Sequence, residues 1–342
     1  MDVLDRLSYG EEKWALDKGP LRCMFPNHTQ EGLFEIVTGP NGSQRLIPCS
    51  LSFNDYYRGE SRYNRPCRPS LYRKGMTDEL IFHERLKVCE MSLLIEDYPL
   101  TGIFRSGLQV QLRNGQFIPL HLNVDTEALA QHYGIKTDLL DLTVDKFVAA
   151  FFATTTYRDG KYVPIEPKEL SYGVFYIYSD NSLGTNDMYS RNMRVVGLQP
   201  FSRPGEQAGF VLKLGKSEDF RLKAQKIKFR HDKDMSWFVF NYTNRANKLF
   251  PQSILESKAK AIISSRYYSS KAFELCMSKY YLDLERRVLE SYLWRLDLQI
   301  KDSSPVRFSK SEKQKVLKDW EERGLDEFRR KVFCRPAFRI DR

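Results

Sequence analysis

ALAQHYGIKTDLLDLTVDKFVAAFFA, residues 128–153, decides the fold of this chain because it places a polar segment between two helical patterns. The first pattern predicts a helix over residues 125–133, with Asp125 as its N-cap and Gly134 as the residue that ends it. The second predicts a helix over residues 144–154 that is almost wholly apolar and therefore buried. The tight loop expected between these helices carries four polar residues: Thr137, Asp138, Asp141 and Thr143.

Polar groups between two buried helices need hydrogen-bond partners or a function, since burying them unpaired is costly. One interpretation is structural: Asp141 or Thr143 caps the second helix, and His132, near the end of the first, is a satisfied interior histidine. The other interpretation is a functional site built from the same side chains. The pattern of residues alone leaves both interpretations open.

The rest of the chain is typical of an α+β fold, a sheet core with helices before, between and after it. Residues 32–48, GLFEIVTGPNGSQRLIP, predict a β-hairpin around a Pro-Asn-Gly turn, and residues 51–60 predict a strand that ends at Gly59. A helix is predicted from Thr77, its N-cap, to about residue 95. Three further strands are expected from their Val, Ile, Tyr and Phe content: YGVFYIYSD (172–180), AGFVLKLG (208–215) and QKIKFRHD (225–232).

The chain becomes helical again after Pro251. Helices are predicted over residues 252–264 and, as one long helix, over residues 271–300, and Ser309 or Ser311 would cap a last helix. Residues 307–342 hold twelve Lys and Arg against seven Asp and Glu, which makes them a basic tail. The predicted domains are an N-terminal extension with the hairpin (1–50), a central domain (50–265) and a helical C-terminal region with the basic tail (266–342).

Composition limits the classes of function. The 342 residues are 42% hydrophobic and carry a net charge of +10, so the chain can bury a core and a polyanion is a candidate partner. We expect no membrane span, because the longest apolar run, residues 147–153, is far too short, and the N-terminus does not resemble a signal peptide. The six cysteines and five histidines form no zinc pattern, so we expect no metal, and free thiols in a reducing cytoplasm. No GxGxxG, GxxxxGK[ST] or GxSxG motif supports a Rossmann, P-loop or serine-hydrolase function.

Residues 56–74, YYRGESRYNRPCRPSLYRK, concentrate positive charge: six basic residues and one acidic residue, interrupted by aromatic residues and prolines. Prolines exclude a long helix, so we expect a basic loop. It opens with Tyr57-Arg58-Gly59 at the end of a strand. Arg58 offers a planar fork for phosphate, and Gly59 allows a ligand or a backbone to come close. On its own, the tripeptide also fits an ordinary exposed arginine at a turn.

A third candidate segment is PFSRPGEQAGFVLKL, residues 200–214. Here Arg203, Glu206 and Gln207 lie on a loop rich in glycine and proline, just before a predicted strand. The structural interpretation is a solvated loop. The functional interpretation is a polar group that the edge of the strand delivers to a site.

Together these segments resemble the FRG domain family over about residues 50–265. The family takes its name from a Phe-Arg-Gly tripeptide, here Tyr57-Arg58-Gly59, and the resemblance continues through AQHYG (130–134), LLDLT (139–143) and EQAGF (206–210). It implies no particular reaction, because the family is poorly characterised biochemically. It suggests a bacterial or phage-defence setting, and therefore a toxin or defence effector.

The order of these segments is also similar to that of arginine-type ADP-ribosyltransferases. That resemblance implies a split-sheet core in which NAD binds extended, as a substrate, and transfer of ADP-ribose to a protein or nucleic acid. Arg58 would hold a phosphate or ribose of NAD, Thr143 would support the site, and Gln207 or Glu206 would contact the nicotinamide-ribose hydroxyl. The residues expected to bind NAD are Tyr57, Arg58, Gly59, Arg73, His132 and Tyr133.

The sequence favours this NAD-using enzyme because compact polar segments between buried helices are costly to keep without a use. The proton of an acceptor would then pass to Glu206, Asp141 or His132. The alternative is a non-catalytic nucleic-acid-binding or sensing module, favoured by the net charge and by the aromatic residues among the arginines of residues 56–72. A third hypothesis is an interaction scaffold with residues 271–300 as its docking face.

Overall fold

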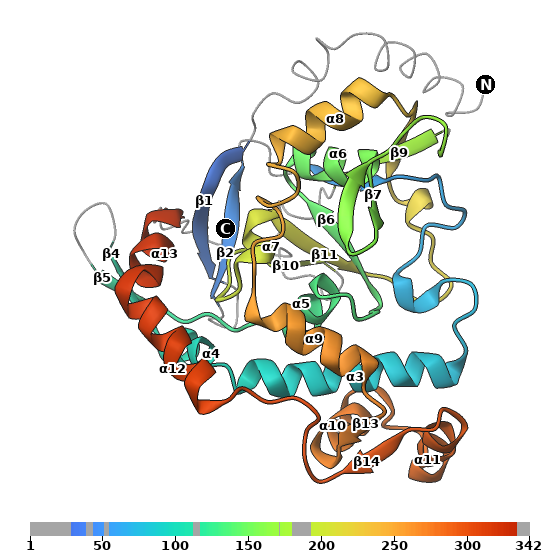
Figure 1. Cartoon of the computed structure of the whole chain (residues 1–342), viewed down its shortest axis with the longest axis vertical. Helices are drawn as coiled ribbons and strands as arrows, with labels where there is room; N and C mark the ends of the chain where they lie inside the picture. The colour runs from blue at the N-terminus through green and yellow to red at the C-terminus, as the bar shows by residue number, and fades with distance from the viewer. Residues whose placement is uncertain are drawn as a thin grey trace, which may run out of the picture.

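A six-stranded antiparallel sheet forms the centre of the protein, with the strand order β10-β11-β6-β3-β9-β12. The structure is a computed structural model that describes residues 29–38, 44–50, 55–111, 117–170, 172–179 and 193–333 (Figure 1). The strands of the sheet are β3 (Asp55–Glu60), β6 (Leu139–Thr143), β9 (Tyr172–Ser179), β10 (Met193–Val195), β11 (Gly209–Lys213) and β12 (Gln225–Arg230). The expected mixed α and β fold with a sheet core is confirmed.

The two halves of the sheet are joined by little backbone pairing where β3 meets β6. β3 pairs with β9 along its whole length, and β6 pairs with β11 in the same way. Among the described residues, β3 and β6 pair at a single position, Tyr57 opposite Thr143. The sheet therefore has a break between its halves, with the last residues of β3 on one side and Asp141 on the other.

One face of the sheet is covered by α6 (Lys146–Thr154) and α8 (Lys233–Tyr242). α6 begins after Asp145, whose carboxylate accepts a hydrogen bond from the backbone N–H of Phe147 at 2.8 Å. A Cβ atom on Gly59 would stand 1.8 Å from the carbonyl oxygen of Ala149, so the backbone of α6 lies directly on β3. The apolar cluster on this face includes Tyr57, Phe175, Phe229, Val148, Phe151 and Val239.

A hairpin and the end of the described chain form a second, smaller sheet. β1 (Thr29–Thr38) and β2 (Gln44–Ser50) pair antiparallel, and β15 (Val332–Phe333) pairs with β1 in parallel. The hairpin is thereby held to the C-terminal part of the chain, while Ile47 of β2 packs into the cluster on the other face of the central sheet. Figure 1 shows the hairpin beside β10 and β11.

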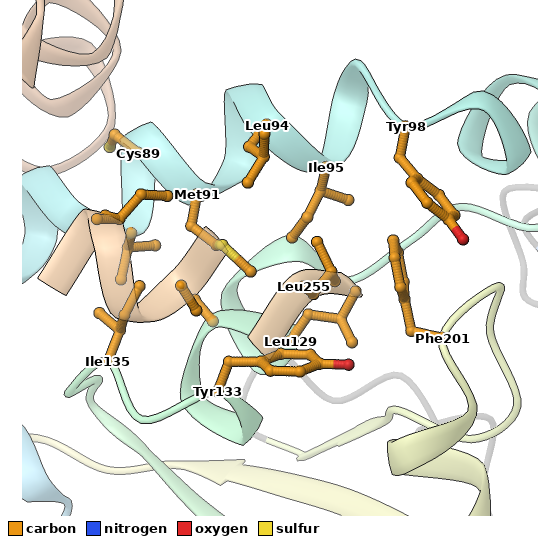
Figure 2. Packing of buried hydrophobic residues seen from close by; sticks show 14 of the residues in the cluster. Cys89, Met91, Leu94, Ile95, Tyr98, Leu129, Tyr133, Ile135, Phe201 and Leu255 are labelled. Atoms are coloured by element: carbon orange, nitrogen blue, oxygen red, sulfur yellow. The ribbon is translucent and has the colours of Figure 1, made fainter. Parts of the chain in front are cut away.

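A long helix, α3 (Asp78–Glu96), lies under the sheet and is buried on opposite sides. α5 (Thr126–His132) and α9 (Ile254–Ser264) pack between α3 and the sheet, whereas α10 (Ser270–Tyr280) and α11 (Arg286–Arg295) lie beyond α3 (Figure 1). Figure 2 shows Met91 and Ile95 of α3 pointing toward Leu129 of α5 and Leu255 of α9. One apolar cluster runs through all of these helices, so residues on both sides of position 265 share a core.

The remaining helices and strands pack around the central sheet and the helices described above. α12, the π-helical turn η4 and α13 pack on α4 through Trp320 and Phe328, whose rings lie 5.4 and 4.8 Å from that of Phe104. No helix among the described residues is long and apolar enough to cross a membrane. The bounds are η1 (Ser70–Tyr72), α4 (Pro99–Ser106), β4 (Leu108–Gln111), β5 (Phe117–Leu120), β7 (Thr155–Arg158), β8 (Lys161–Pro164), α7 (Ser202–Glu206), η3 (Phe220–Leu222), β13 (Tyr267–Ser269), β14 (Gln299–Lys301), α12 (Lys310–Asp319), η4 (Trp320–Gly324) and α13 (Leu325–Lys331).

The predicted long helix over residues 271–300 is wrong. Tyr281 leaves the helical conformation, with φ −138° and ψ 39°, and a turn separates α10 from α11. The regular spacing of leucines imitates a single helix, but Leu282 is 80% exposed whereas Leu289 is fully buried. Residues 271–300 therefore do not form one continuous docking face.

Two predicted loops are also wrong. The polar loop contains a strand, β6, because Leu140 and Leu142 alternate with polar residues and pack into the core on one face. Asp145, rather than Asp141 or Thr143, caps the helix that follows. The loop carrying Arg203 and Glu206 is the short helix α7.

Several other described elements agree with the sequence, whereas α4, α8, α13 and the strands β4, β5, β7, β8, β10, β13 and β14 were not predicted. The hairpin strands, the three later strands and the helices capped by Thr77 and Asp125 are confirmed. Ser309 caps the last helical segment in a capping box with Glu312. The Pro-Asn-Gly turn at residues 40–42 and the end of the basic tail, residues 334–342, lie outside the described residues. The division of the chain at residues 50 and 265 stays a prediction.

Candidate functional site

A cavity of about 280 Å³ opens at the break between β3 and β6. Its walls come from β3 and the loop after it, the end of α5, β6, α6 and the segment between α7 and β11. Eight of the residues predicted from the sequence line it: Tyr57, Arg58, Gly59, Arg73, His132, Asp141, Thr143 and Gln207. Side chains up to about 150 positions apart along the chain therefore meet at the break in the sheet.

Protein groups on both sides of the break hold the Arg58 guanidinium. Its Nε and Nη2 atoms donate to Oε1 of Glu60, 3.0 and 2.9 Å away, and its Nη1 donates to the backbone carbonyl of Asp141 at 2.9 Å. Burial lowers the pKa of Arg58, but the charges of Glu60 and other neighbours such as Asp141, with the hydrogen bond to Glu60, together outweigh burial and hold the pKa above its ordinary value. Arg58 is thus a charged cross-link that bridges the two halves of the sheet where backbone pairing does not.

Glu60 is a site residue that the sequence analysis did not select. Its carboxylate also accepts hydrogen bonds from Nδ2 of Asn64 at 3.3 Å and from Sγ of Cys67 at 3.4 Å. Burial raises the pKa of the Cys67 thiol to about 12, so this thiol stays protonated beside the carboxylate. The sequence could have indicated Glu60 as the partner of Arg58. Residues two apart on a strand share a face, and Glu60 is the one acidic residue among the basic residues 56–74.

Asp141 and His132 form what we call the inner end of the cavity. Oδ1 of Asp141 and Nε2 of His132 are both buried, and among the described residues neither atom has a hydrogen-bond partner. Burial lowers the pKa of His132, and the charge of Asp141 opposes this shift only in part. The inner end therefore contains a carboxylate oxygen and a nitrogen of a neutral imidazole that no described group of the protein bonds.

The polar groups of Thr143 and Gln207 are used inside the protein. Oγ1 of Thr143 donates to the carbonyl of Gln207 at 2.8 Å and accepts from the N–H of Asp145 at 3.0 Å. Nε2 of Gln207 donates to the carbonyl of Leu249 at 3.0 Å. These bonds tie β6, α6 and the start of β11 together, so the two side chains shape the wall of the cavity.

Glu206 and Tyr133 do not line the cavity. Glu206 forms an ion pair with Lys331 of α13 at 2.6 Å. The hydroxyl of Tyr133 donates to Oγ of Ser253 at 2.9 Å, which anchors α5 to the start of α9. The structure therefore separates these two predicted residues from the others.

Arg203 positions the end of α5 from the opposite side. Its Nη1 donates to the backbone carbonyl of His132 at 2.8 Å, and its guanidinium lies 4.5 Å from the centre of the Tyr133 ring. An ion pair with Glu256 at 3.6 Å completes its contacts with α9. The sequence placed Arg203 on a candidate loop but did not indicate this role.

Arg62 and Arg73 form what we call the mouth of the cavity. Both side chains line it and are exposed, and among the described residues neither forms an ion pair. Nε of Arg73 donates to the carbonyl of Arg68 at 3.3 Å, which orients that side chain. Arg65, also exposed, instead stacks on Tyr63 at 4.7 Å and does not line the cavity. The mouth is therefore positively charged while the inner end is not.

The comparison with protein families identifies the part of the chain that contains this site. Residues 54–161 match the FRG domain, so the chain carries an FRG domain. β3, the mouth, α5, β6 and α6 all lie within the matched residues, whereas Gln207 lies beyond them. No curated protein and no solved structure matches the chain.

Proposed function

We propose that the FRG domain of this protein binds NAD in the cavity and acts as an ADP-ribosyltransferase-like enzyme on a protein or nucleic acid. The observation that supports this proposal is the convergence of Arg58, Thr143 and Gln207, with Asp141 and His132, around one cavity at the break in the sheet. The sequence separates these residues widely. A cavity that collects them has the chemical groups that such a reaction needs.

The reaction would break the bond between the anomeric carbon of ribose and the nicotinamide nitrogen, and nicotinamide would leave with that electron pair. The anomeric carbon then carries positive charge, which the carboxylate of Asp141 would stabilise. An acceptor nucleophile forms the new bond to the same carbon. Its proton would pass to His132 or Asp141, and the neutral imidazole is suited to accept it because burial lowers the pKa of His132.

The setting that fits this activity is a cytoplasmic toxin or phage-defence effector. Three described cysteines, Cys67, Cys89 and Cys276, are free thiols, which suits a reducing compartment. The FRG match supports the biological role only through the resemblance given above.

A specific observation also favours the alternative, a nucleic-acid-binding module. The loop after β3 exposes Arg62, Arg65, Arg73 and Lys74, and Arg65 stacks on Tyr63. Basic side chains with an aromatic ring among them suit a nucleic-acid backbone and its bases. Such binding would weaken steeply as salt rises, because it depends on phosphate contacts.

Calorimetric titration with NAD tests the proposal on the wild type, Arg58→Ala and the control Arg65→Ala. We expect the wild type and Arg65→Ala to bind alike, since Arg65 does not line the cavity, and Arg58→Ala to lose binding. Circular dichroism on each variant separates loss of binding from loss of folding. A folded Arg58→Ala variant that binds and consumes NAD like the wild type would contradict the proposal.

A further inference from the structure

The inner end of the cavity requires hydrogen-bond partners that the protein does not supply. Oδ1 of Asp141 and Nε2 of His132 are buried and, among the described residues, unpartnered. Leaving such atoms unsatisfied is costly, so a ligand that offers a hydroxyl or amide there gains both hydrogen bonds. A carboxylate oxygen can only accept, so the ligand group that meets Asp141 must be a donor.

The inner end does not suit an anion. Arg58 is close by, but its Nε and Nη2 already bind the Glu60 carboxylate at 3.0 and 2.9 Å. Glu60 balances its charge, and the Asp141 carboxylate then leaves the inner end without net positive charge. A phosphate at that position would have to displace Glu60 and would face Asp141.

The mouth, unlike the inner end, suits an anion. Arg62 and Arg73 are exposed, line the same cavity and have no ion-pair partner among the described residues. Arginine is the side chain best shaped to bind phosphate oxygens in pairs. The cavity therefore changes from hydrogen-bond accepting at its inner end to cationic at its mouth.

The size of the cavity limits how much ligand it encloses. Ligand pockets commonly span roughly 300–1,000 Å³. A volume of about 280 Å³ lies just below that range, so one sugar or nucleoside fits inside and a complete dinucleotide does not. The rest of a longer ligand would extend over the mouth.

We infer that the cavity binds a phosphate ester of a sugar or nucleoside in one orientation. The uncharged end donates a hydrogen bond to Asp141 and contacts His132, and the phosphate lies at the mouth on Arg62 and Arg73. This inference rests on the proposed function in that NAD would enter with its nicotinamide-ribose half inside. Arg58 is then a positioning residue that holds the sheet halves, and the phosphate contacts belong to the mouth.

The test compares two pairs of probes that differ by one phosphate: ribose with ribose 5-phosphate, and nicotinamide riboside with nicotinamide mononucleotide. Each is titrated calorimetrically into the wild type, Arg62→Ala/Arg73→Ala, Asp141→Asn, and the control Arg65→Ala/Lys74→Ala from the same loop. We expect the mouth variant to weaken the phosphorylated member of each pair about tenfold or more, and to leave the other within twofold. Asp141→Asn weakens both members alike, and the control changes neither.

The outcomes separate this inference from the proposed function. If ribose 5-phosphate shows the expected pattern while NAD is neither bound nor consumed, the proposed function fails and the orientation stands. If NAD binds but the mouth variant weakens ribose and ribose 5-phosphate equally, the orientation is wrong. Millimolar concentrations of every probe without detectable binding would overturn it as well.

Discussion

Glu127 on α5 and Asp141 on β6 are both carboxylates set among buried groups, but the protein treats them differently. Oε1 of Glu127 accepts from the hydroxyl of Tyr280 at 2.7 Å, and Oε2 accepts from Nη2 of Arg194 at 3.2 Å, with Lys279 at 3.8 Å. We call these four residues the Glu127 cluster. Oδ1 of Asp141, in contrast, has no partner among the described residues.

The difference indicates which buried polar groups serve the fold and which are available to a ligand. Burial would raise the pKa of Glu127, but Lys279, Tyr280 and Arg194 outweigh it and hold the pKa below its ordinary value. The Glu127 cluster therefore fastens α10 to α5 through a carboxylate whose two oxygens both accept hydrogen bonds. The inner end of the cavity is the counterpart whose atoms lack partners among the described residues, and the variants Glu127→Ala and Asp141→Asn test this contrast.

The largest expected effect is on stability, from Glu127→Ala. The change leaves Arg194, Lys279 and Tyr280 without their shared buried partner, and we expect a loss of about 3–5 kcal/mol in the free energy of unfolding. Urea denaturation measures it. Glu290→Ala is the matched control, because its pair with Arg286 is half exposed and is worth at most about 1 kcal/mol. Equal losses of unfolding free energy in Glu127→Ala and Glu290→Ala would show that the buried Glu127 cluster stabilises the fold no more than a surface ion pair does.

Asp141→Asn should lower the enzymatic rate strongly and the stability of the fold only slightly. The amide keeps the shape of the side chain but removes its charge, so we expect nicotinamide release from NAD to fall about 100-fold. The free energy of unfolding should change by less than about 1 kcal/mol, since no described hydrogen bond to Oδ1 is lost. Chromatography of released nicotinamide gives the rate, and Asp159→Asn, at an exposed turn, is the control. A variant that keeps its full rate would show that Asp141 takes no part.

A smaller effect is expected from acidification, through a histidine of the scaffold. Burial, helped by Lys87, lowers the pKa of His83 from 6.5 to about 4. The folded protein therefore binds this proton more weakly than the unfolded chain, so the stability that His83 contributes is complete above pH 6.5. It is lost as pH falls toward 4, by about 2–3 kcal/mol.

His83→Gln isolates this contribution, because glutamine also bonds the Tyr268 hydroxyl, which lies 2.8 Å from Nε2 of His83. The fall in unfolding free energy between pH 6.5 and pH 4 should be smaller in the variant by that amount. An unchanged slope in thermal or urea unfolding across this interval would contradict the prediction. NAD binding at pH 7 should not differ, since His83 does not line the cavity.

Local signals in the sequence predicted the hairpin, the strands β3, β9, β11 and β12 and the helices α3, α5, α6, α9 and α12, but not α4, α8 or the short strands. Thr77, Asp125 and Ser309 each accept a hydrogen bond at a helix start, which is the chemistry that makes such residues recognisable. β6 was missed because five residues with one aspartate at the centre read as a loop between helices. α10 and α11 were joined because leucine spacing carries no information about the turn at Tyr281.

Only part of the candidate site could be predicted from the sequence. The break in the sheet depends on β3 meeting β6, and the Arg58–Asp141 contact joins residues 83 positions apart, which no local pattern reports. The resemblance to known families, rather than spacing, selected Arg58, Thr143 and Gln207. Polar character alone could not show that Thr143 and Gln207 bond within the protein while Asp141 and His132 remain available.

The most direct test of the central claim, that this cavity binds NAD, is the imidazole spectrum of His132 during a titration with NAD. The chain has five histidines, so the ring resonances can be assigned by single substitutions. We expect the His132 resonances to shift in proportion to bound NAD, while those of His83, outside the cavity, stay in place. Saturating NAD that leaves the His132 resonances unmoved would contradict the account.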